Sequence, residues 1–400
     1  MTAGPDVLVV GLGPAGAAAA IRLARLGIRV TAIDRARFPR EKVCSEYMSP
    51  ETLRHLDTVG VLPRVERFGA PLHGAKVVGP RGSELTGLFR RADGHPFRPT
   101  GLSMPRRELD EALVGLAREA GVTVVEGAAL VGLDRTGPRP QAVVRRGSAI
   151  EAIAPRLIVG ADGLRSVAAR LVGRRTHGLL RRYGFVAHVA DVRNVHLTAE
   201  MHVGEGAYVG LNAIGAGVTN VAVVTSGARA KAAAGDAERF WFETLERFPG
   251  VRGRVDRQKI VRRVMVAGPF AAWSRSVAGD GFLLLGDAAD FFDPFTGEGI
   301  GAALRGAALA APVVAAALER AGPITKESLA PYAAGRREAF RGKWAVERMI
   351  GYGMLSPTLF DRAVERLGRR GLADTLVGVT GDFIPAREVL RPGFLAAMMV

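Results

Sequence analysis

The ten residues Val7-Leu8-Val9-Val10-Gly11-Leu12-Gly13-Pro14-Ala15-Gly16 decide the fold of this 400-residue chain. The four leading apolar residues predict a buried parallel strand, and the alanine-rich run that follows, over 15–26, predicts a helix. Gly11 permits the tight turn between them, Gly13 leaves space for a pyrophosphate, and Gly16 lets the helix pack closely on the strand. The free N–H groups and the dipole at the start of the helix suit bound phosphates.

A carboxylate completes this pattern. The apolar run 28–33 predicts a second strand, and Asp34 follows directly. At the end of that strand its oxygens can accept hydrogen bonds from an adenosine ribose. Strand, glycine turn, helix and terminal acid together predict a Rossmann-type dinucleotide site. The motif by itself does not separate FAD from NAD.

A second glycine-rich region follows another apolar strand farther along the chain. Gly286-Asp287 comes after the run 282–285, and the stretch Asp293-Pro294-Phe295-Thr296-Gly297-Glu298-Gly299-Ile300 leads into a predicted helix over 300–318. Asp287 could bind a ribityl hydroxyl, or it could simply cap a helix. The two glycines of the second stretch let backbone N–H groups approach a planar ring, and the positive helix end suits the pyrimidine edge of a reduced flavin.

The middle of the chain changes to short, alternating segments that glycines interrupt. Antiparallel strands are predicted over 183–191, 198–203, 207–213 and 218–225, and a helix capped by Asp236 follows. The predicted fold class is therefore α/β: a Rossmann-type FAD-binding domain, an inserted antiparallel-sheet substrate domain and a helical C-terminal region. The expected bounds are 1–72, 98–175 and 276–325 for the first, 73–97 and 176–275 for the second, and 326–400 for the third.

A third loop, Gly160-Ala161-Asp162-Gly163-Leu164-Arg165-Ser166, again follows an apolar strand. With the first glycine turn and Gly286-Asp287, in this order, it makes the chain resemble the para-hydroxybenzoate hydroxylase-like flavoproteins, which include geranylgeranyl reductases and flavin-dependent halogenases. The resemblance implies FAD as cofactor, NADPH or NADH as reductant, and no separate nicotinamide domain. It also implies that Gly160–Ser166 helps to bind both cofactors, that Gly286-Asp287 contacts the FAD ribose, and that Arg106 contacts the cofactor.

The predicted cofactor-binding set joins these motifs to their neighbours. It consists of Gly11, Gly13, Pro14, Ala15, Gly16, Asp34, Arg35, Cys44, Arg106, Leu130, Asp162, Gly163, Gly286, Asp287, Gly297, Gly299 and Ile300. No metal site is predicted.

Two segments bear on the branch of this family. Pro39–Glu46 and Asp293–Ile300 look more like the reductases and halogenases than the simple aromatic hydroxylases. The resemblance places Cys44 near the isoalloxazine ring, whereas a free cysteine is commonly a small core residue. Tyr208 falls where the geranylgeranyl reductases carry a tyrosine–tryptophan–phenylalanine–proline signature, but Gly210 and Ala213 replace the tryptophan and the proline. The halogenase tryptophan pair is absent, so halogenation is not predicted.

These features predict an FAD-dependent monooxygenase that hydroxylates or epoxidises a hydrophobic phenolic, polyketide or lipid-like substrate in secondary metabolism. Such chemistry needs few protein acids and bases. One alternative is a flavin-dependent reductase or dehydrogenase of carbon–carbon double bonds, with Cys44 or Tyr208 as proton donor. The other is a flavin-binding protein without catalysis. The expected catalytic set is Pro294, Phe295, Thr296, Tyr208, Asn212 and Cys44, and His188 is either a base for a phenol or a satisfied core histidine.

Composition narrows the expected partners and location. The net charge is +16, but the basic residues are scattered without interleaved aromatic residues, so no nucleic-acid partner is expected. Peripheral contact with an anionic membrane surface stays open. A single cysteine, no recognisable signal segment and an apolar stretch over 307–318 that is too short to span a bilayer together predict a cytoplasmic protein. The oligomeric state is left open.

Overall fold

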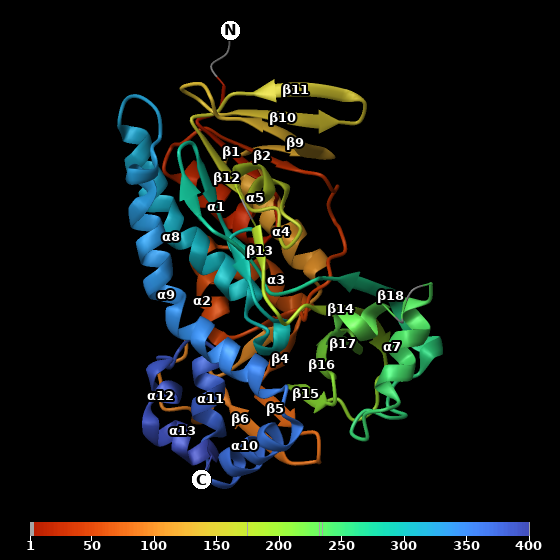
Figure 1. Ribbon diagram of the computed structural model, residues 1–400. Coiled ribbons are helices and arrows are strands. Elements are labelled where there is room, and N and C mark those ends of the chain that lie inside the picture. Colours follow the sequence, from red (N-terminus) through yellow and green to blue (C-terminus); the bar gives the residue numbers. More distant parts are fainter. Residues whose placement is uncertain (1–3, 174, 232, 234, 400) are drawn as a thin grey trace.

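The computed structural model describes residues 4–173, 175–231, 233 and 235–399 (Figure 1). Its nucleotide-binding layer is a six-stranded sheet of order β20-β21-β12-β1-β2-β8. The strands are β1 (Val7–Val10), β2 (Val30–Asp34), β8 (Thr123–Glu126), β12 (Leu157–Gly160), β21 (Phe282–Leu284) and β20 (Ala278–Gly279). All pairs are parallel except β20 with β21. The apolar β1 lies between two neighbours and is buried throughout, as its composition predicts.

The two faces of this sheet are covered differently. One apolar core joins the sheet to helices that include α1 (Pro14–Arg25), α2 (Pro50–Val59), α4 (Arg106–Glu119) and α8 (Gly299–Glu319). The other face packs against α5 (Val167–Val172) and a meander of β9 (Ala128–Asp134), β10 (Gln141–Arg146) and β11 (Ala149–Ile153). The sequence reasoning did not foresee this meander, whose outermost strand is almost entirely exposed and so lacks a clear apolar alternation.

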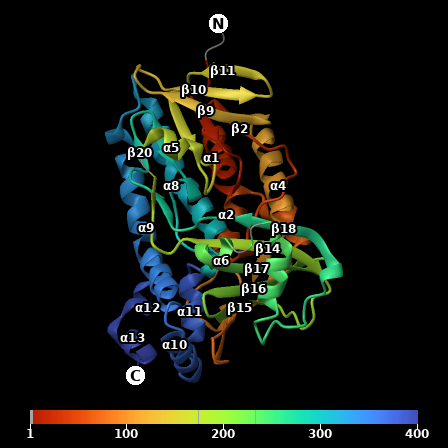
Figure 2. The same ribbon diagram turned by 45° about the vertical axis from the view of Figure 1, so that its right-hand side comes forward.

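A seven-stranded sheet forms the second layer, in the order β18-β14-β17-β16-β15-β5-β6. Figure 2 shows β14, β17, β16 and β15 side by side below the nucleotide-binding layer. The bounds are β5 (Gly74–Val78), β6 (Glu84–Leu88), β14 (Arg182–Ala190), β15 (Thr198–Gly204), β16 (Ala207–Gly215), β17 (Val218–Ser226) and β18 (Ile260–Ala267). The antiparallel strands predicted in the middle of the chain are confirmed. The early strand β5 joins them by parallel pairing with β15.

Helix α7 (Ala237–Leu245) packs on one face of this sheet. The Asp236 side chain accepts a hydrogen bond from the Arg239 backbone N–H at 2.9 Å, so the predicted N-cap is confirmed. Trp241 and Leu245 are fully buried against the sheet. The short helix α6 (Gly227–Lys231) contacts β14 and β17 of this sheet, whereas the short helix α3 (Leu62–Val65) packs with α2 and α4 in the core of the nucleotide-binding layer.

Two three-stranded sheets lie between the layers and orient the loops around the cavity. One joins β3 (Tyr47–Met48), β7 (Gly101–Ser103) and β4 (Ala70–Leu72). The other joins β13 (Arg175–His177), β19 (Ala272–Ser274) and β22 (Asp290–Phe291). Through them, the segments before β3 and after β21 reach the space between the two large sheets.

The C-terminal region is helical, as predicted. It consists of α9 (Lys326–Gly353), α10 (Pro357–Arg369), α11 (Ala373–Thr380), α12 (Arg387–Leu390) and α13 (Pro392–Met399). Helix α9 runs the length of the molecule beside α8, and the four shorter helices gather at its far end (Figure 1). Their apolar side chains share a core with Leu85 on β6.

Helix α8 agrees with the helix predicted over 300–318, but its apolar part is longer than the stretch over 307–318 on which the expectation of too short a span rests. It continues through Pro312 to span 21 residues, and in the described part of the chain it is the one helix long and apolar enough to cross a membrane. More than half of its apolar window is buried, at 56%, and it packs between α1 and α9. This burial is typical of the core helix of a folded domain.

Candidate functional site

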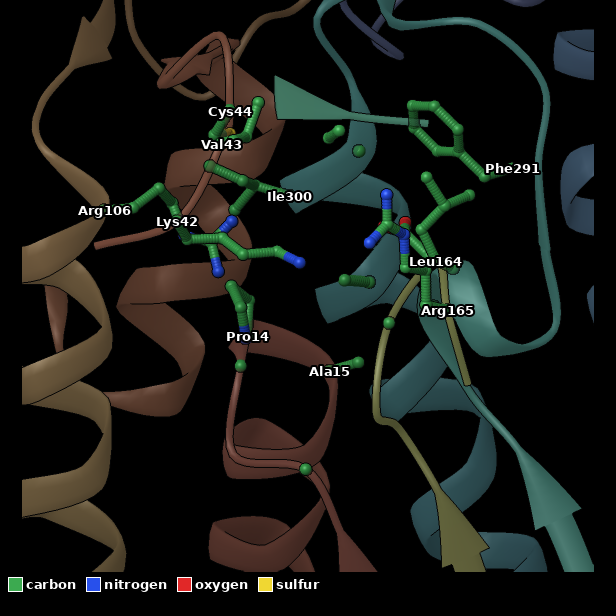
Figure 3. A pocket seen from close by; sticks show the side chains of 18 of the residues that line it. Pro14, Ala15, Lys42, Val43, Cys44, Arg106, Leu164, Arg165, Phe291 and Ile300 are labelled. Carbon is green, nitrogen blue, oxygen red and sulfur yellow. The ribbon is translucent and has the colours of Figure 1, made fainter. Parts of the chain in front are cut away.

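A cavity of about 430 Å³ lies between the two large sheets, a volume typical of small-molecule and cofactor sites (Figure 3). It gathers residues from the glycine turn after β1, the end of β2, the segment before β3, α4, the loop after β12, the start of α8 and the seven-stranded sheet. The predicted site residues that line it are Gly11, Gly13, Pro14, Ala15, Asp34, Arg35, Cys44, Arg106, Leu130, Asp162, Gly163, Tyr208, Asn212, Gly286, Asp287, Pro294, Gly297, Gly299 and Ile300.

Each glycine of the first turn is required for a different structural reason. Gly11 has a φ of +96°, and a Cβ there would lie 2.6 Å from the Ala161 carbonyl oxygen. A Cβ on Gly16 would lie 1.8 Å from the Gly11 carbonyl oxygen, so Gly16 serves helix–strand packing and does not line the cavity. Gly13 faces the cavity, where the nearest atoms to a Cβ would be the guanidinium nitrogens of Arg106 and Arg40, at 3.6 and 3.7 Å.

Asp34 ties the turn to the end of β2. Its two carboxylate oxygens accept backbone N–H groups of Leu12 and Ala36, each at 2.8 Å. The side chain still lines the cavity. Because each carboxylate oxygen has a further lone pair, Asp34 can also accept a ribose hydroxyl.

Positive charge collects beside Gly13. Arg106 makes two hydrogen bonds of 2.9 Å to the Asp110 carboxylate, and Arg40 lies 3.0 Å from the same carboxylate. Asp110 is fully buried, so two guanidinium groups share one enclosed negative charge and keep an excess of positive charge toward the cavity. The first turn of α1 contains no acidic residue.

These features form a cradle that fits the pyrophosphate of FAD. The N-terminus of α1, the open position at Gly13 and the two arginines all favour a doubly charged anion there. The acid at the end of β2 fits the ribose of the same dinucleotide. The residues present therefore match the cofactor that the sequence motifs predict.

Lys42 and Asp287 bring opposite charges to the middle of the cavity. Burial lowers the pKa of Lys42, and the carboxylate of Asp287 opposes that shift. Burial raises the pKa of Asp287, and Lys42, Arg106 and Arg175 oppose that shift. Figure 3 shows Lys42 pointing toward Arg165 across the cavity. The guanidinium of Arg165 is itself held by the Gly268 carbonyl oxygen, at 3.1 Å.

The Asp162 carboxylate is occupied by the protein. It accepts the backbone N–H groups of Val167 and Ala168, at 2.6 and 3.1 Å, and a hydrogen bond from the Ser166 hydroxyl. Asp162 thus caps α5 and fixes the loop. Gly163, with a φ of +79°, turns that loop along the cavity wall.

The substrate-side end of the cavity is mostly apolar. Its wall is the inner face of the seven-stranded sheet, together with Phe270 and Phe291 from outside that sheet. The lining residues are Gly184, Val186, Met201, Tyr208, Gly210, Asn212, Asn220, Ala222, Val224, Ala267, Phe270 and Phe291.

Two polar side chains of this wall, Tyr208 and Asn212, are bonded to residues outside it. Tyr208 donates its hydroxyl proton to Asp293 at 2.7 Å, and Arg182 forms a 2.8 Å ion pair with the other oxygen of Asp293. Burial, followed by the charge of Asp293, raises the pKa of Tyr208. Asn212 donates to the hydroxyl of Ser103. Tyr208 therefore has no free proton with which to orient a substrate.

Two predicted catalytic residues do not reach the main cavity. The ring of Phe295 packs edge-on against Tyr208, with centroids 5.3 Å apart, and against Phe360. Thr296 lines a second, smaller cavity on the other side of the loop, toward α9. Of the three loop residues predicted to face the flavin, Pro294 alone lines the main cavity. The loop forms a 3₁₀ turn, which directs successive side chains to different sides.

Glu46 is a functional-site neighbour that the sequence reasoning missed. Fully buried and with a φ of +62°, it accepts the Arg106 backbone N–H and the Asn220 side chain, each at 2.9 Å. His188 Nε2 lies 2.7 Å from it, so His188 belongs to this buried cluster and does not line the cavity. The cluster anchors the loop that carries Cys44, whose sulfur accepts the Glu46 backbone N–H at 3.2 Å. No local sequence signal marks Glu46, because its partners come from distant strands.

Comparison with known proteins agrees with this site. The family model described as "FAD binding domain" matches residues 5–343. A menaquinone reductase of Mycobacterium tuberculosis is 30% identical over 77% of this chain and 76% of its own length. A 6-methylpretetramide 4-monooxygenase of Streptomyces rimosus is 30% identical over 96% of this chain and 91% of its own.

Solved structures share the fold. A flavoprotein/dehydrogenase from Cytophaga hutchinsonii superposes with a TM-score of 0.85 at 20% identity, covering 98% of this chain and 96% of its own. This similarity extends the match through the C-terminal helices. Because the cavity contains a dinucleotide cradle and the family model covers most of the sequence, the chain belongs to the FAD binding domain family and is an FAD-dependent oxidoreductase.

Proposed function

We propose that this protein is a flavoprotein monooxygenase that uses NADPH or NADH to hydroxylate or epoxidise a hydrophobic aromatic, polyketide or lipid-like substrate. Bound FAD would supply the redox chemistry, with the nicotinamide as the source of the hydride and dioxygen as the electron acceptor. The overall reaction consumes one NAD(P)H, one proton and one O₂. It places one oxygen atom in the product and the other in water.

The observation that carries this proposal is the chemistry of the substrate-side wall. Among the described residues of the seven-stranded sheet that line the cavity there is no carboxylate and no histidine. The Tyr208 proton is committed to Asp293. A wall without a free acid or base suits a reaction in which the reduced cofactor and oxygen perform the chemistry and the protein positions the substrate and excludes water.

The chain's own residues then have limited tasks. Arg106 and Arg40 would hold the pyrophosphate of FAD, and the glycines around the start of α8 would let backbone N–H groups come close to its ring. The apolar sheet face desolvates the substrate beside the ring. The Glu46 cluster keeps the Lys42–Cys44 segment in place.

The Streptomyces rimosus relative supports this reading, because a protein named as a monooxygenase aligns with 96% of the chain. The alternative, a reductase of carbon–carbon double bonds, is supported by the menaquinone reductases and by the digeranylgeranylglycerophospholipid reductase 1 of Methanococcoides burtonii, at 29% identity. That reaction needs a proton donor at the substrate. Cys44 is the lining thiol that could serve.

The test is an isotope experiment on the purified holoenzyme with a panel of aromatic polyketides, phenols and polyene lipids. Under ¹⁸O₂ with NADPH or NADH, we expect products that carry one ¹⁸O atom and need oxygen to form. Products that gain two hydrogens without oxygen, formed equally under argon, would establish the reductase instead. If reduced nicotinamide is consumed but neither kind of product forms from any member of the panel, the result would contradict the proposed hydrophobic substrate class.

A further inference from the structure

A group of exposed apolar side chains stands where α9 meets α10. Tyr352, Leu355 and Leu359 are exposed to 43, 62 and 48%, and Leu179, in the loop after β13, is exposed to 89%. We call these four residues the corner patch. In Figure 1 this corner lies at the lower end of α9, where α10 begins.

The loop after β13 and the end of α9 are in contact. The side chain of Leu180 lies 3.7 Å from the position that a Cβ on Gly351 would occupy, and Arg182 donates to the Gly351 carbonyl oxygen at 3.0 Å. Leu179 and Tyr352 are the chain neighbours of these two contacting residues. The corner patch therefore draws on two separate segments that pack against each other, and a group of exposed apolar side chains of this kind marks an interaction site.

Positive charge surrounds the corner patch. Arg181, Arg348 and Arg362 are exposed, and no ion pair joins any of them to an acid within the part of the chain that the structure describes. The nearby Asp361 is already engaged by the Arg81 backbone N–H and the Ser83 hydroxyl, each at 2.8 Å. Glu347 is turned inward, and burial, opposed by Lys343, raises its pKa to about 7. The charge that the corner offers to a partner is thus positive, as is the net charge of the whole chain, +16.

Aromatic rings connect the corner patch to the cavity. The Tyr352 ring packs against Phe292 with centroids 6.0 Å apart, and the preceding residue, Phe291, lines the cavity. Phe291 also packs against Phe270, which lines it too. A surface bound at the corner would lie close to the apolar end of the site.

We propose that the corner patch docks this protein on an anionic lipid bilayer, with its leucines among the acyl chains at the headgroup boundary and its arginines on lipid phosphates. Apolar burial and attraction to negative headgroups act together in such peripheral binding. A second copy of the chain is a poorer partner, because a two-fold interface places the patch on itself and would set the arginine rims against each other. A bilayer offers both the apolar depth and the opposite charge.

The test is flotation of the full-length holoenzyme with vesicles of phosphatidylcholine alone or with about one-third phosphatidylglycerol. We expect binding to the anionic vesicles that weakens with salt, and we expect Leu179→Ser/Leu355→Ser to lower the partition coefficient at least about tenfold. The matched control is Leu26→Ser/Ile150→Ser. It removes apolar side chains of similar exposure, 57 and 67%, directly after α1 and on β11, and should change binding less than about twofold.

Both double variants should keep the flavin absorbance and thermal midpoint of the parent, because the replaced side chains are exposed. Equal vesicle binding by the patch and control variants would overturn the proposal, as would no binding to anionic vesicles. Sedimentation velocity without lipid provides a further arm. A dimer that Leu179→Ser/Leu355→Ser dissociates would assign the corner patch to a second copy of the chain instead.

Discussion

The two ends of the cavity are built in different ways. At the nucleotide end, groups that face the cofactor cradle are fixed by residues close to them in sequence: Gly11 and Gly13 are two residues apart, and Arg106, the first residue of α4, is paired with Asp110 one helical turn away. At the substrate end, polar groups are held by partners distant in sequence. Tyr208 bonds to Asp293, 85 residues on, and Asn212 bonds to Ser103, 109 residues back.

Because of this difference, substitutions at the two ends should affect different properties of the protein. Groups of the nucleotide end face a charged ligand, so changing them should alter cofactor binding while the fold persists. Polar groups of the substrate end are satisfied by one another in an apolar setting, so removing one leaves a buried partner unpaired and destabilises the fold.

Gly13→Val should give the largest effect, loss of FAD binding. A Cβ at this position meets only the guanidinium groups of Arg106 and Arg40, at the ordinary van der Waals distances of 3.6 and 3.7 Å, so the fold tolerates the side chain. The added atoms occupy the place of the pyrophosphate, and we expect flavin content to fall below about one-tenth of the parent. The flavin absorbance of purified protein, with circular dichroism as a check on folding, measures this.

Gly306→Ala is the matched control for that variant. A Cβ there, on α8, has no neighbour within 4 Å, so the variant should bind FAD fully. If Gly13→Val protein is purified yellow, the assignment of the first turn to the pyrophosphate is wrong.

Arg182→Met tests the substrate end. Asp293 is buried, and this change leaves it with the Tyr208 hydroxyl and the Phe295 backbone N–H but no counter-charge. Breaking a buried ion pair from one side costs roughly 3–5 kcal/mol of unfolding free energy. Urea denaturation of the holoenzyme should show this loss. An unchanged midpoint would mean that the Arg182–Asp293 ion pair does not stabilise the fold, and would contradict the proposed difference between the two ends.

The same contrast explains how far the sequence could predict the molecule. Short sequence motifs predict the glycine turn, Asp34 and the loop at Gly286. The alternation of apolar and polar residues predicts the strands of the second sheet. Glu46 and the pairing of Tyr208 with Asp293 could not be foreseen, because they depend on how distant strands meet. The direction of Phe295 and Thr296 depends on a single 3₁₀ turn whose geometry the glycine pattern does not specify.

Glu298→Gln tests the boundary between the ends, where α8 begins. Burial, opposed by Lys343, raises the Glu298 pKa from its ordinary 4.5 to about 7. The folded chain therefore keeps a proton that the unfolded chain releases, and Glu298 stabilises the fold at low pH and loses this contribution as pH rises toward 7. Glutamine does not titrate in this range, so the substitution removes this dependence of stability on pH. Relative to the parent, the variant should gain roughly 2 kcal/mol of unfolding free energy between about pH 5 and pH 8. A parallel pH dependence of the two proteins would contradict this.

Cys44→Ser should give the smallest effect and separates the two redox proposals most directly. The Cys44 sulfur accepts the Glu46 backbone N–H at 3.2 Å, and a serine hydroxyl can accept the same bond, so the loop should keep its position. For a monooxygenase, in which the wall supplies no proton, steady-state turnover should fall no more than about threefold. For a reductase that protonates its substrate from this thiol, the loss should reach about a hundredfold or more, because a hydroxyl is a far weaker acid than a thiol. Rapid-reaction kinetics measure the two half-reactions, flavin reduction and flavin reoxidation, separately. If flavin reduction by NAD(P)H is unchanged while reoxidation by substrate under argon collapses, Cys44 is the proton donor and the substrate end is chemically active after all.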